Sequence, residues 1–256
     1  GYTGAAQEVS MNRFFVKPDD MTEDSAAIIG EDVKHISKVL RMQSGDRVML
    51  SDGCGYEYLA EIETISRERV ELKLLDKKPC PAEPKQRITL YQGIPKAGKM
   101  ELIIQKCVEL GINGIIPVAA ERSVVRVKPG EYKAKQTRYQ RVACEAAKQS
   151  GRGIIPQVSW AGDFTAVLDI AVKKDLGLFM YETGEREKLD DVLSANKDIA
   201  TAAIITGPEG GFAQFEADLA RVCKLHICSM GERILRCETA PVVALTATMY
   251  ATGNLS

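Results

Sequence analysis

Hydrophobic and polar residues alternate in short runs over the first third of the chain, from Asn12 to about Leu75. A period of two is typical of strands that bury one face. Asp52-Gly53, followed by Gly55, has the composition of a hairpin turn, and Asp32 to Arg41 has the pattern of a short helix. Together these runs predict a small β-barrel, with strands at Arg13 to Val16, Asp46 to Ser51, Tyr56 to Ile62 and Arg69 to Leu74.

The pattern changes after residues 77–85, where three prolines and several charges are typical of a linker. Apolar runs of strand length then alternate with longer helical runs, which indicates a largely parallel α/β sheet. Strands are predicted at residues 88–92, 114–118, 155–158, 176–181, 202–206 and 225–230, and helices at 99–110, 132–149, 212–223 and 241–251. We therefore expect a lead at residues 1–10 (a cloning remnant or disordered), a β-barrel domain at 11–78, a linker at 79–86 and an α/β domain at 87–256.

Composition narrows the class of protein. The 256 residues are 45% apolar and 27% charged, which is normal for a soluble globular protein, and no apolar run has the length of a membrane-spanning helix. Seven cysteines without a Cys-x-x-Cys pair indicate reduced thiols and a cytoplasmic location. Only two histidines are present, which argues against a zinc site and a Ser-His-Asp hydrolase, so we expect no metal.

The net charge of −1 conceals an asymmetry along the chain. Residues 85–152 contain 14 lysines and arginines against 5 acidic residues, whereas the remainder contains 20 against 30. Clustered basic residues favour a nucleic-acid surface, because they displace counterions from phosphates. The alternative is a solvated helix face. We interpret the segment as an RNA contact.

Two short loops near the C-terminus each follow a predicted strand. The first is Gly207-Pro208-Glu209-Gly210-Gly211, and the second spans Met230 to Ala240. Glycine-rich loops at the carboxyl ends of parallel strands commonly bind small ligands. A glutamate in the first loop argues against a phosphate cradle, and neither a P-loop nor a dinucleotide fingerprint is present. The loops therefore indicate a site for a nucleoside cofactor without a triphosphate; the alternatives are a plain strand-to-helix turn and a doubly wound nucleotide-binding enzyme.

These loops resemble those of the SPOUT superfamily of S-adenosylmethionine-dependent RNA methyltransferases. The similarity is strongest to its 16S ribosomal RNA uridine-N3 methyltransferases, which carry a Gly-Pro-Glu-Gly-Gly loop and a Leu/Met-Gly-x-Arg-Ile-Leu-Arg-x-Glu-Thr-Ala loop. The resemblance runs from about Met11 to the end of the chain, and Cys237 stands at a position that varies in the family. It implies a trefoil-knotted SPOUT α/β domain after a PUA-like barrel that grips RNA. It also implies S-adenosylmethionine as cofactor, small-subunit ribosomal RNA or the assembled subunit as substrate, and a homodimer.

The resemblance further implies roles for individual residues. Arg236, Arg233 and Glu238 are the catalytic candidates, although Glu238 could equally cap the last helix, and the catalytic base stays open. Ile205, Ile234 and Leu235 could wall the adenine or simply pack, and Glu182 is expected to be a surface carboxylate. The full cofactor set is Tyr181, Ile205, Thr206, Gly207, Pro208, Glu209, Gly210, Gly211, Met230, Gly231, Ile234, Leu235 and Ala240. The RNA set is Arg13, His35, Arg41, Lys96, Arg122, Arg138 and Arg152. The competing hypothesis is a non-catalytic RNA-binding protein of ribosome assembly, which would not need the two loops.

Overall fold

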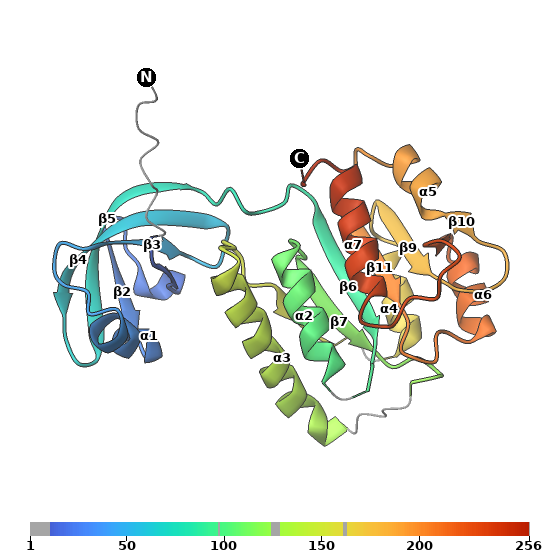
Figure 1. The fold of residues 1–256 in the computed structure, drawn as a ribbon, viewed down its shortest axis with the longest axis horizontal. Helices are drawn as coiled ribbons and strands as arrows, with labels where there is room; N and C mark the ends of the chain where they lie inside the picture. The colour runs from blue at the N-terminus through green and yellow to red at the C-terminus, as the bar shows by residue number, and fades with distance from the viewer. Residues whose placement is uncertain (1–10, 97, 124–128, 161–162, 256) are drawn as a thin grey trace. The chain divides into compact units, whose positions relative to one another are not determined.

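The computed structural model describes residues 11–96, 98–123, 129–160 and 163–255. The expectation for residues 1–10 therefore lies outside the described residues. The chain forms two compact units, which Figure 1 shows in ribbon form. The first reaches to Glu83 and also takes in Gly151–Ile155, and the second contains Pro84–Ser150 and Pro156–Ser256.

A five-stranded sheet in the order β1-β3-β4-β5-β2 forms the first unit. All pairs are antiparallel except β1 with β3. The edge strands β1 and β2 are not paired with each other in the described part of the chain, so the expected barrel is a curled half-barrel. Its elements are β1 (Arg13–Phe15), the short 3-10 helix η1 (Pro18–Asp20), β2 (Ser25–Ile29), α1 (Glu31–Lys34), the π-helical turn η2 (His35–Val39), β3 (Arg47–Ser51), β4 (Tyr56–Ile65) and β5 (Arg69–Pro79).

The turn between β3 and β4 shows why this sequence forms a hairpin. The Asp52 carboxylate accepts hydrogen bonds from the backbone N–H groups of Cys54 at 2.7 Å and Tyr56 at 3.1 Å. An aspartate that bonds its own backbone in this way stabilises a tight turn. Gly53 and Gly55 take the positive φ values of 73° and 105° that the turn requires.

A short segment distant in sequence completes the half-barrel unit. Glu83 accepts hydrogen bonds from Arg152 Nε at 2.9 Å and from the backbone N–H groups of Gly153 at 2.8 Å and Ile154 at 2.9 Å. The Arg152 side chain is only 2% exposed. This arrangement corrects the expectation that Arg152 faces RNA, because its guanidinium is used to hold the returning chain.

The second unit is built on a parallel seven-stranded sheet in the order β10-β12-β9-β11-β6-β7-β8. Its strands are β6 (Arg87–Gly93), β7 (Gly114–Val118), β8 (Gln157–Val158), β9 (Leu176–Met180), β10 (Glu187–Lys188), β11 (Thr201–Thr206) and β12 (His226–Ser229). Its helices are α2 (Lys99–Glu109), α3 (Pro129–Gln149), α4 (Phe164–Ala171), α5 (Leu189–Ala195), α6 (Gln214–Val222) and α7 (Ala240–Ala251). The alternating pattern thus predicted the fold class correctly; the threading of the chain into a knot stays a prediction.

Helices cover both faces of this sheet (Figure 1). Side chains of α4 and α6 share one apolar core with β6, β9, β11 and β12. On the other face, α7 packs on β11 and against α2 and α5, and α2 packs on α3. This double cover explains why the strands are nearly continuous apolar runs. No helix in the described residues is long and apolar enough to cross a membrane.

Candidate active site

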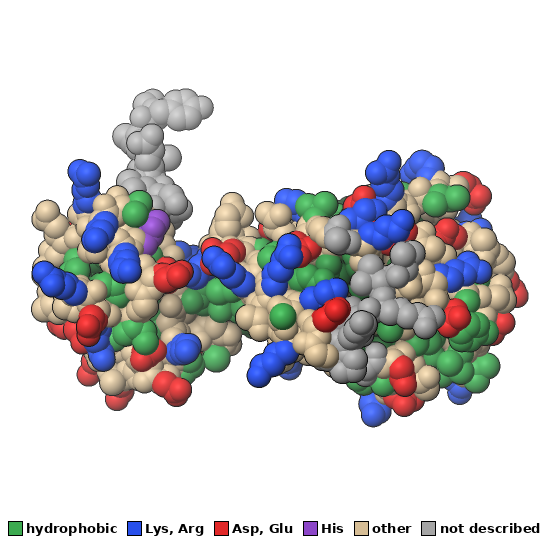
Figure 2. Space-filling model, turned by 90° about the horizontal axis from the view of Figure 1, so that it is seen from below, with side chains coloured by type: hydrophobic (Ala, Val, Ile, Leu, Met, Phe, Trp, Pro, Cys, Tyr) green, Lys and Arg blue, Asp and Glu red, His purple; other side chains and the backbone are tan. Residues whose placement is uncertain are grey.

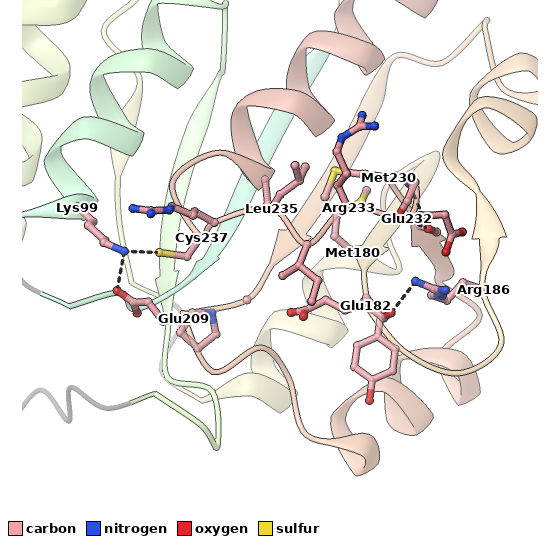
Figure 3. Close-up of a pocket in the computed structure, with 18 residues that line it drawn as sticks. Lys99, Met180, Glu182, Arg186, Glu209, Met230, Glu232, Arg233, Leu235 and Cys237 are labelled. Carbon is pink, nitrogen blue, oxygen red and sulfur yellow. Dashed lines mark hydrogen bonds and ion pairs between the residues drawn. The ribbon is translucent and has the colours of Figure 1, made fainter.

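A pocket of about 390 Å³ lies in the second unit. Its walls come from the residues that directly follow β9, β11 and β12, together with the start of α2 and the start of α7. Because these strands are parallel, their carboxyl ends meet at one edge of the sheet, where open α/β folds bind ligands. The pocket is lined by Lys99, Met180, Tyr181, Glu182, Arg186, Gly207, Pro208, Glu209, Ser229, Met230, Gly231, Glu232, Arg233, Ile234, Leu235, Arg236, Cys237 and Ala240 (Figure 3).

Gln92, near the end of β6, fixes the start of the first loop. Its side-chain nitrogen donates to the Gly207 carbonyl at 3.0 Å, and its side-chain oxygen accepts from the Thr206 hydroxyl at 2.7 Å. Gln92 and Thr206 are fully buried. A buried amide with satisfied bonds specifies one geometry, since breaking any bond leaves an unpaired polar group. Gln92 therefore holds the backbone where β11 ends and the first loop begins.

The glycines of the first loop are required by close neighbours. A Cβ on Gly210 would lie 3.0 Å from both the Cβ and the carbonyl oxygen of Arg122. Gly211 has φ of +65°, and a Cβ there would lie 2.8 Å from a Glu182 carboxylate oxygen. The tight contacts are therefore with the chain itself, and they fix the path of the loop.

Glu209 finds its hydrogen-bond donors within the protein. Its two carboxylate oxygens accept from the backbone N–H of Lys96 at 3.0 and 3.2 Å, and Oε1 lies 3.3 Å from the Lys99 ammonium. Burial alone would raise the pKa of Glu209, but the hydrogen bonds from backbone N–H groups and Lys99 outweigh it and lower that pKa. The glutamate in the first loop therefore has hydrogen-bond donors, but they are groups of the protein itself. A contact between Glu209 and the cofactor stays a prediction.

Lys99 and Cys237 meet at one side of the pocket, next to Glu209 (Figure 3). The Lys99 ammonium also forms an ion pair with Glu238 at 3.0 Å. The hydrogen bond from Lys99 lowers the pKa of Glu238 to about 2. Burial, together with the hydrogen bond to Glu238, raises the pKa of the Cys237 thiol to about 12. Glu238 is therefore ionised and Cys237 is a neutral thiol at neutral pH, which makes the thiol a poor nucleophile.

The side chains in the middle of the second loop are exposed. Ile234 is 82% exposed, and Arg233 and Arg236 are also exposed. Within the described ranges, no hydrogen bond or ion pair engages either guanidinium. Both arginines line the pocket and can offer planar, permanently charged donors to a substrate.

The structure brings together most of the residues expected to bind the cofactor. Five expected residues do not line the pocket but are next to lining residues in the chain. Ile205 and Thr206 are fully buried, and the others are Gly210, Gly211 and Glu238. The other members of the expected cofactor set, with Arg233 and Arg236, line the pocket. Their roles toward a cofactor or substrate stay predictions.

Sequence reasoning missed several residues of the wall, namely Lys99, Met180, Arg186, Ser229, Glu232 and Cys237. It also treated Glu182 as a surface carboxylate, whereas Glu182 lines the pocket, and Arg186 donates to its carbonyl. Glu182 comes two residues after the end of β9, so its place beyond a parallel strand was the available signal. Lys99 gave no local signal, because only the tertiary fold brings α2 to the two loops.

The expected RNA contacts differ in their availability. Arg13 forms a 2.8 Å ion pair with Glu57, and Arg138 pairs with Glu101 at 2.8 Å although its side chain is 70% exposed. His35, Arg41, Lys96 and Arg122 are also exposed. On the face shown in Figure 2, basic side chains are interspersed with acidic ones. The described side chains therefore form no continuous positive patch on that face.

The pocket suits a nucleoside that carries an amino-acid tail. Its volume is within the range of small-molecule sites, at roughly 300–1,000 Å³. Apolar side chains such as Met180, Met230 and Leu235 can pack on a purine, while the backbone of Gly207 and Gly231 and nearby charged groups can bond its polar parts. The residues present thus fit S-adenosylmethionine.

Comparison with known proteins first defines the class. Residues 82–249 match a family described as an RNA methyltransferase domain, and residues 28–75 match an RNA methyltransferase PUA domain. The protein is an RNA methyltransferase with a PUA domain and a SPOUT domain. It is 33% identical over 252 residues to ribosomal RNA small subunit methyltransferase E of Bacillus subtilis, covering 96% of this chain and 98% of that protein. The chain belongs to the ribosomal RNA small subunit methyltransferase E family.

Two solved structures bear on the cofactor. Ribosomal RNA small subunit methyltransferase E from Neisseria gonorrhoeae, bound to S-adenosylmethionine, superposes with a TM-score of 0.82 at 29% identity, covering 94% of this chain and 97% of that one. A methyltransferase from Legionella pneumophila in complex with S-adenosylmethionine gives a TM-score of 0.82 at 28% identity, covering 95% and 98%. The cofactor of this family is S-adenosylmethionine.

Proposed function

We propose that this protein methylates N3 of a specific uridine in small-subunit ribosomal RNA, with S-adenosylmethionine as donor. The observation that carries the proposal is the pocket at the carboxyl edge of the sheet, where the second loop presents Arg233 and Arg236 without partners in the described part of the chain. The family supports ribosomal RNA as substrate, and the resemblance of the loops supports uracil N3.

Bound S-adenosylmethionine supplies an electrophilic methyl group on a sulfonium. The chain must place uracil N3 close to that methyl group and stabilise negative charge as the N3 proton leaves. Arg236 is suited to the second task, because a guanidinium can donate to a uracil oxygen while its positive charge stabilises the developing anion.

Glu238 is the second candidate for a direct role. Its ionised carboxylate is held by Lys99, and a pKa of about 2 makes it a weak proton acceptor. We therefore assign the larger catalytic effect to Arg236, with Arg233 as its neighbour on the same loop.

RNA binding is proposed to use both units. In the half-barrel, the candidates are His35 and Arg41, which are exposed, and Arg13, which is paired with Glu57. In the second unit they are Lys96, Arg122 and Arg138. Their contribution is phosphate neutralisation, which positions the RNA without reading its sequence.

A two-fold dimer is proposed through α7 and α5. A second cavity of about 780 Å³ lies between these helices and shares the segment Ser229–Glu232 with the first pocket. Tyr250 is 75% exposed and Val243 is 36% exposed on this surface, and apolar surface of this kind favours association. Light scattering should give twice the chain mass; a monomer at micromolar concentration would refute the dimer.

A cytoplasmic location is proposed from the ribosomal substrate and the seven free cysteines.

The nucleoside product tests the proposed reaction. Small-subunit RNA from a strain that lacks the gene is incubated with the protein and methyl-labelled S-adenosylmethionine, digested, and separated by mass spectrometry. We expect the label in N3-methyluridine, and none when Arg236→Ala replaces the wild type. Label in another nucleoside would overturn the proposed target atom.

A further inference from the structure

Lys99 joins the two loops that enclose the pocket. Its ammonium lies 3.3 Å from Oε1 of Glu209 in the first loop and 3.0 Å from Oε2 of Glu238 at the end of the second. The same nitrogen is 3.6 Å from the Cys237 sulfur. In the described residues, no other ion pair or hydrogen bond joins the charged side chains of the two loops, so one side chain of α2 connects segments 207–211 and 230–240.

The position of Lys99 is fixed by the helix that carries it. Lys99 is the first residue of α2, directly after Gly98, which has φ of 85°. The following residues Met100, Ile103 and Ile104 are fully buried beneath the helix. The backbone N–H of Lys96 in the preceding turn bonds Glu209 as well. The ammonium thus projects from an anchored helix start.

The chemistry of the ammonium indicates how it acts. A lysine ammonium has three N–H donors, and Glu209, Glu238 and Cys237 supply three acceptors. All three are therefore used within the protein. Without the ammonium, two carboxylates would face each other with no cation between them, and like charges at this separation repel.

We propose that Lys99 is a positioning residue for methyl transfer, which holds the two loops at the separation that the cofactor requires by binding Glu209 and Glu238. The inference rests on the proposed cofactor role of this pocket. It assigns Lys99 no contact with the cofactor, which distinguishes it from a lysine that binds the methionine carboxylate directly.

A double-mutant cycle separates these two roles. Calorimetry with S-adenosylhomocysteine is carried out on the full-length wild type and on Lys99→Met, Glu238→Gln and the double variant. We expect Lys99→Met to weaken binding by about tenfold or more, and to add little in the Glu238→Gln background, because loss of the Glu238 contact already breaks the link between the two loops. An equal loss in both backgrounds would mean direct contact and would overturn the proposal, as would wild-type affinity in Lys99→Met.

Three controls keep the result interpretable. Lys106→Met removes an exposed lysine of the same helix, paired with Glu109 at 2.9 Å, and should leave affinity unchanged. Lys99→Arg should retain affinity within about threefold, because a guanidinium can bridge the same carboxylates. Turnover of Lys99→Met at saturating S-adenosylmethionine should fall less than its kcat/KM for this cofactor; an equal fall in both would overturn the positioning role.

The proposal and the proposed function fail in different ways. If the wild type binds S-adenosylhomocysteine but forms no N3-methyluridine, the proposed nucleotide chemistry is wrong and the role of Lys99 stands. If the wild type binds and Lys99→Met binds equally well, only the role of Lys99 is wrong. A wild type that does not bind would refute both.

Discussion

The two loops of the pocket differ in how the protein holds them. Gly207–Gly211 is fixed from several directions: Gln92 bonds the Gly207 carbonyl, Lys96 bonds Glu209, and Arg122 lies against Gly210. The second loop is held mainly at its end, where Cys237 and Glu238 meet Lys99. Its middle, with Ile234 82% exposed, has no comparable contacts with the described part of the chain.

The difference teaches how the work of the site is divided. A loop whose hydrogen bonds are already satisfied offers a binding surface that needs little reorganisation. Exposed arginines without partners in the described segments keep their donors for a substrate that arrives later. We infer that the first loop gives the cofactor a fixed binding surface, and that the second loop, which also lines the cofactor pocket, presents Arg233 and Arg236 to the RNA base. The following predictions test this division.

Arg236→Lys should produce the largest effect, on turnover. Lysine keeps the positive charge but loses the planar set of donors, so kcat should fall by about 100-fold, the size seen when one donor to a developing anion is lost. S-adenosylhomocysteine affinity should stay within about threefold of the wild type. Single-turnover kinetics measure the first quantity; a normal rate would transfer the role to Arg233.

Gln92→Leu should lower the free energy of unfolding by about 1–3 kcal/mol, since the buried Thr206 hydroxyl and Gly207 carbonyl lose their partner. Gln105→Leu, at an exposed position of α2, is the matched control and should change stability little. Urea unfolding measures both. Equal stability of the two variants would mean that Gln92 does not fix the first loop.

The sequence predicted the fold class because alternation and parallel-strand composition are local signals, and it located the pocket because both glycine loops follow strands. It missed β2, α4, β10 and α5, and the Gly151–Ile155 segment, whose partner Glu83 is about 70 residues away in the chain. Lys99 and Gln92 were missed for the same physical reason. Their partners Glu238 and Gly207 are brought to them only by tertiary packing.

The ion pair of Glu238 should appear in the acid dependence of stability. Lys99 lowers the pKa of this carboxyl from its ordinary value of 4.5 to about 2. The stabilisation is therefore fully present above pH 4.5 and is lost as the pH falls toward 2. The wild type should exceed Glu238→Gln in stability at neutral pH, and the difference should shrink below pH 4.5. Glu232→Gln, exposed on the same loop, is the control; a difference that is constant with pH would contradict the pairing.

The smallest effect is expected in RNA binding. Arg138→Ala removes one exposed cation of the basic segment, so the slope of log affinity against log salt should fall by about one. Arg221→Ala, an exposed arginine of α6 outside the segment, should leave the slope unchanged. Filter binding at four salt concentrations decides the matter. Identical slopes would mean that the segment is a solvated face.

Calorimetry with S-adenosylhomocysteine on the wild type, Gly210→Val and Arg236→Ala tests the division between the loops most directly. A Cβ at Gly210 meets Arg122 at 3.0 Å, so valine must displace the first loop, whereas Gly130→Ala in α3 meets no atom within 4 Å and serves as the control. We predict that Gly210→Val loses binding while Arg236→Ala and Gly130→Ala retain it. Loss of binding in Arg236→Ala, with wild-type affinity in a folded Gly210→Val, would contradict the account.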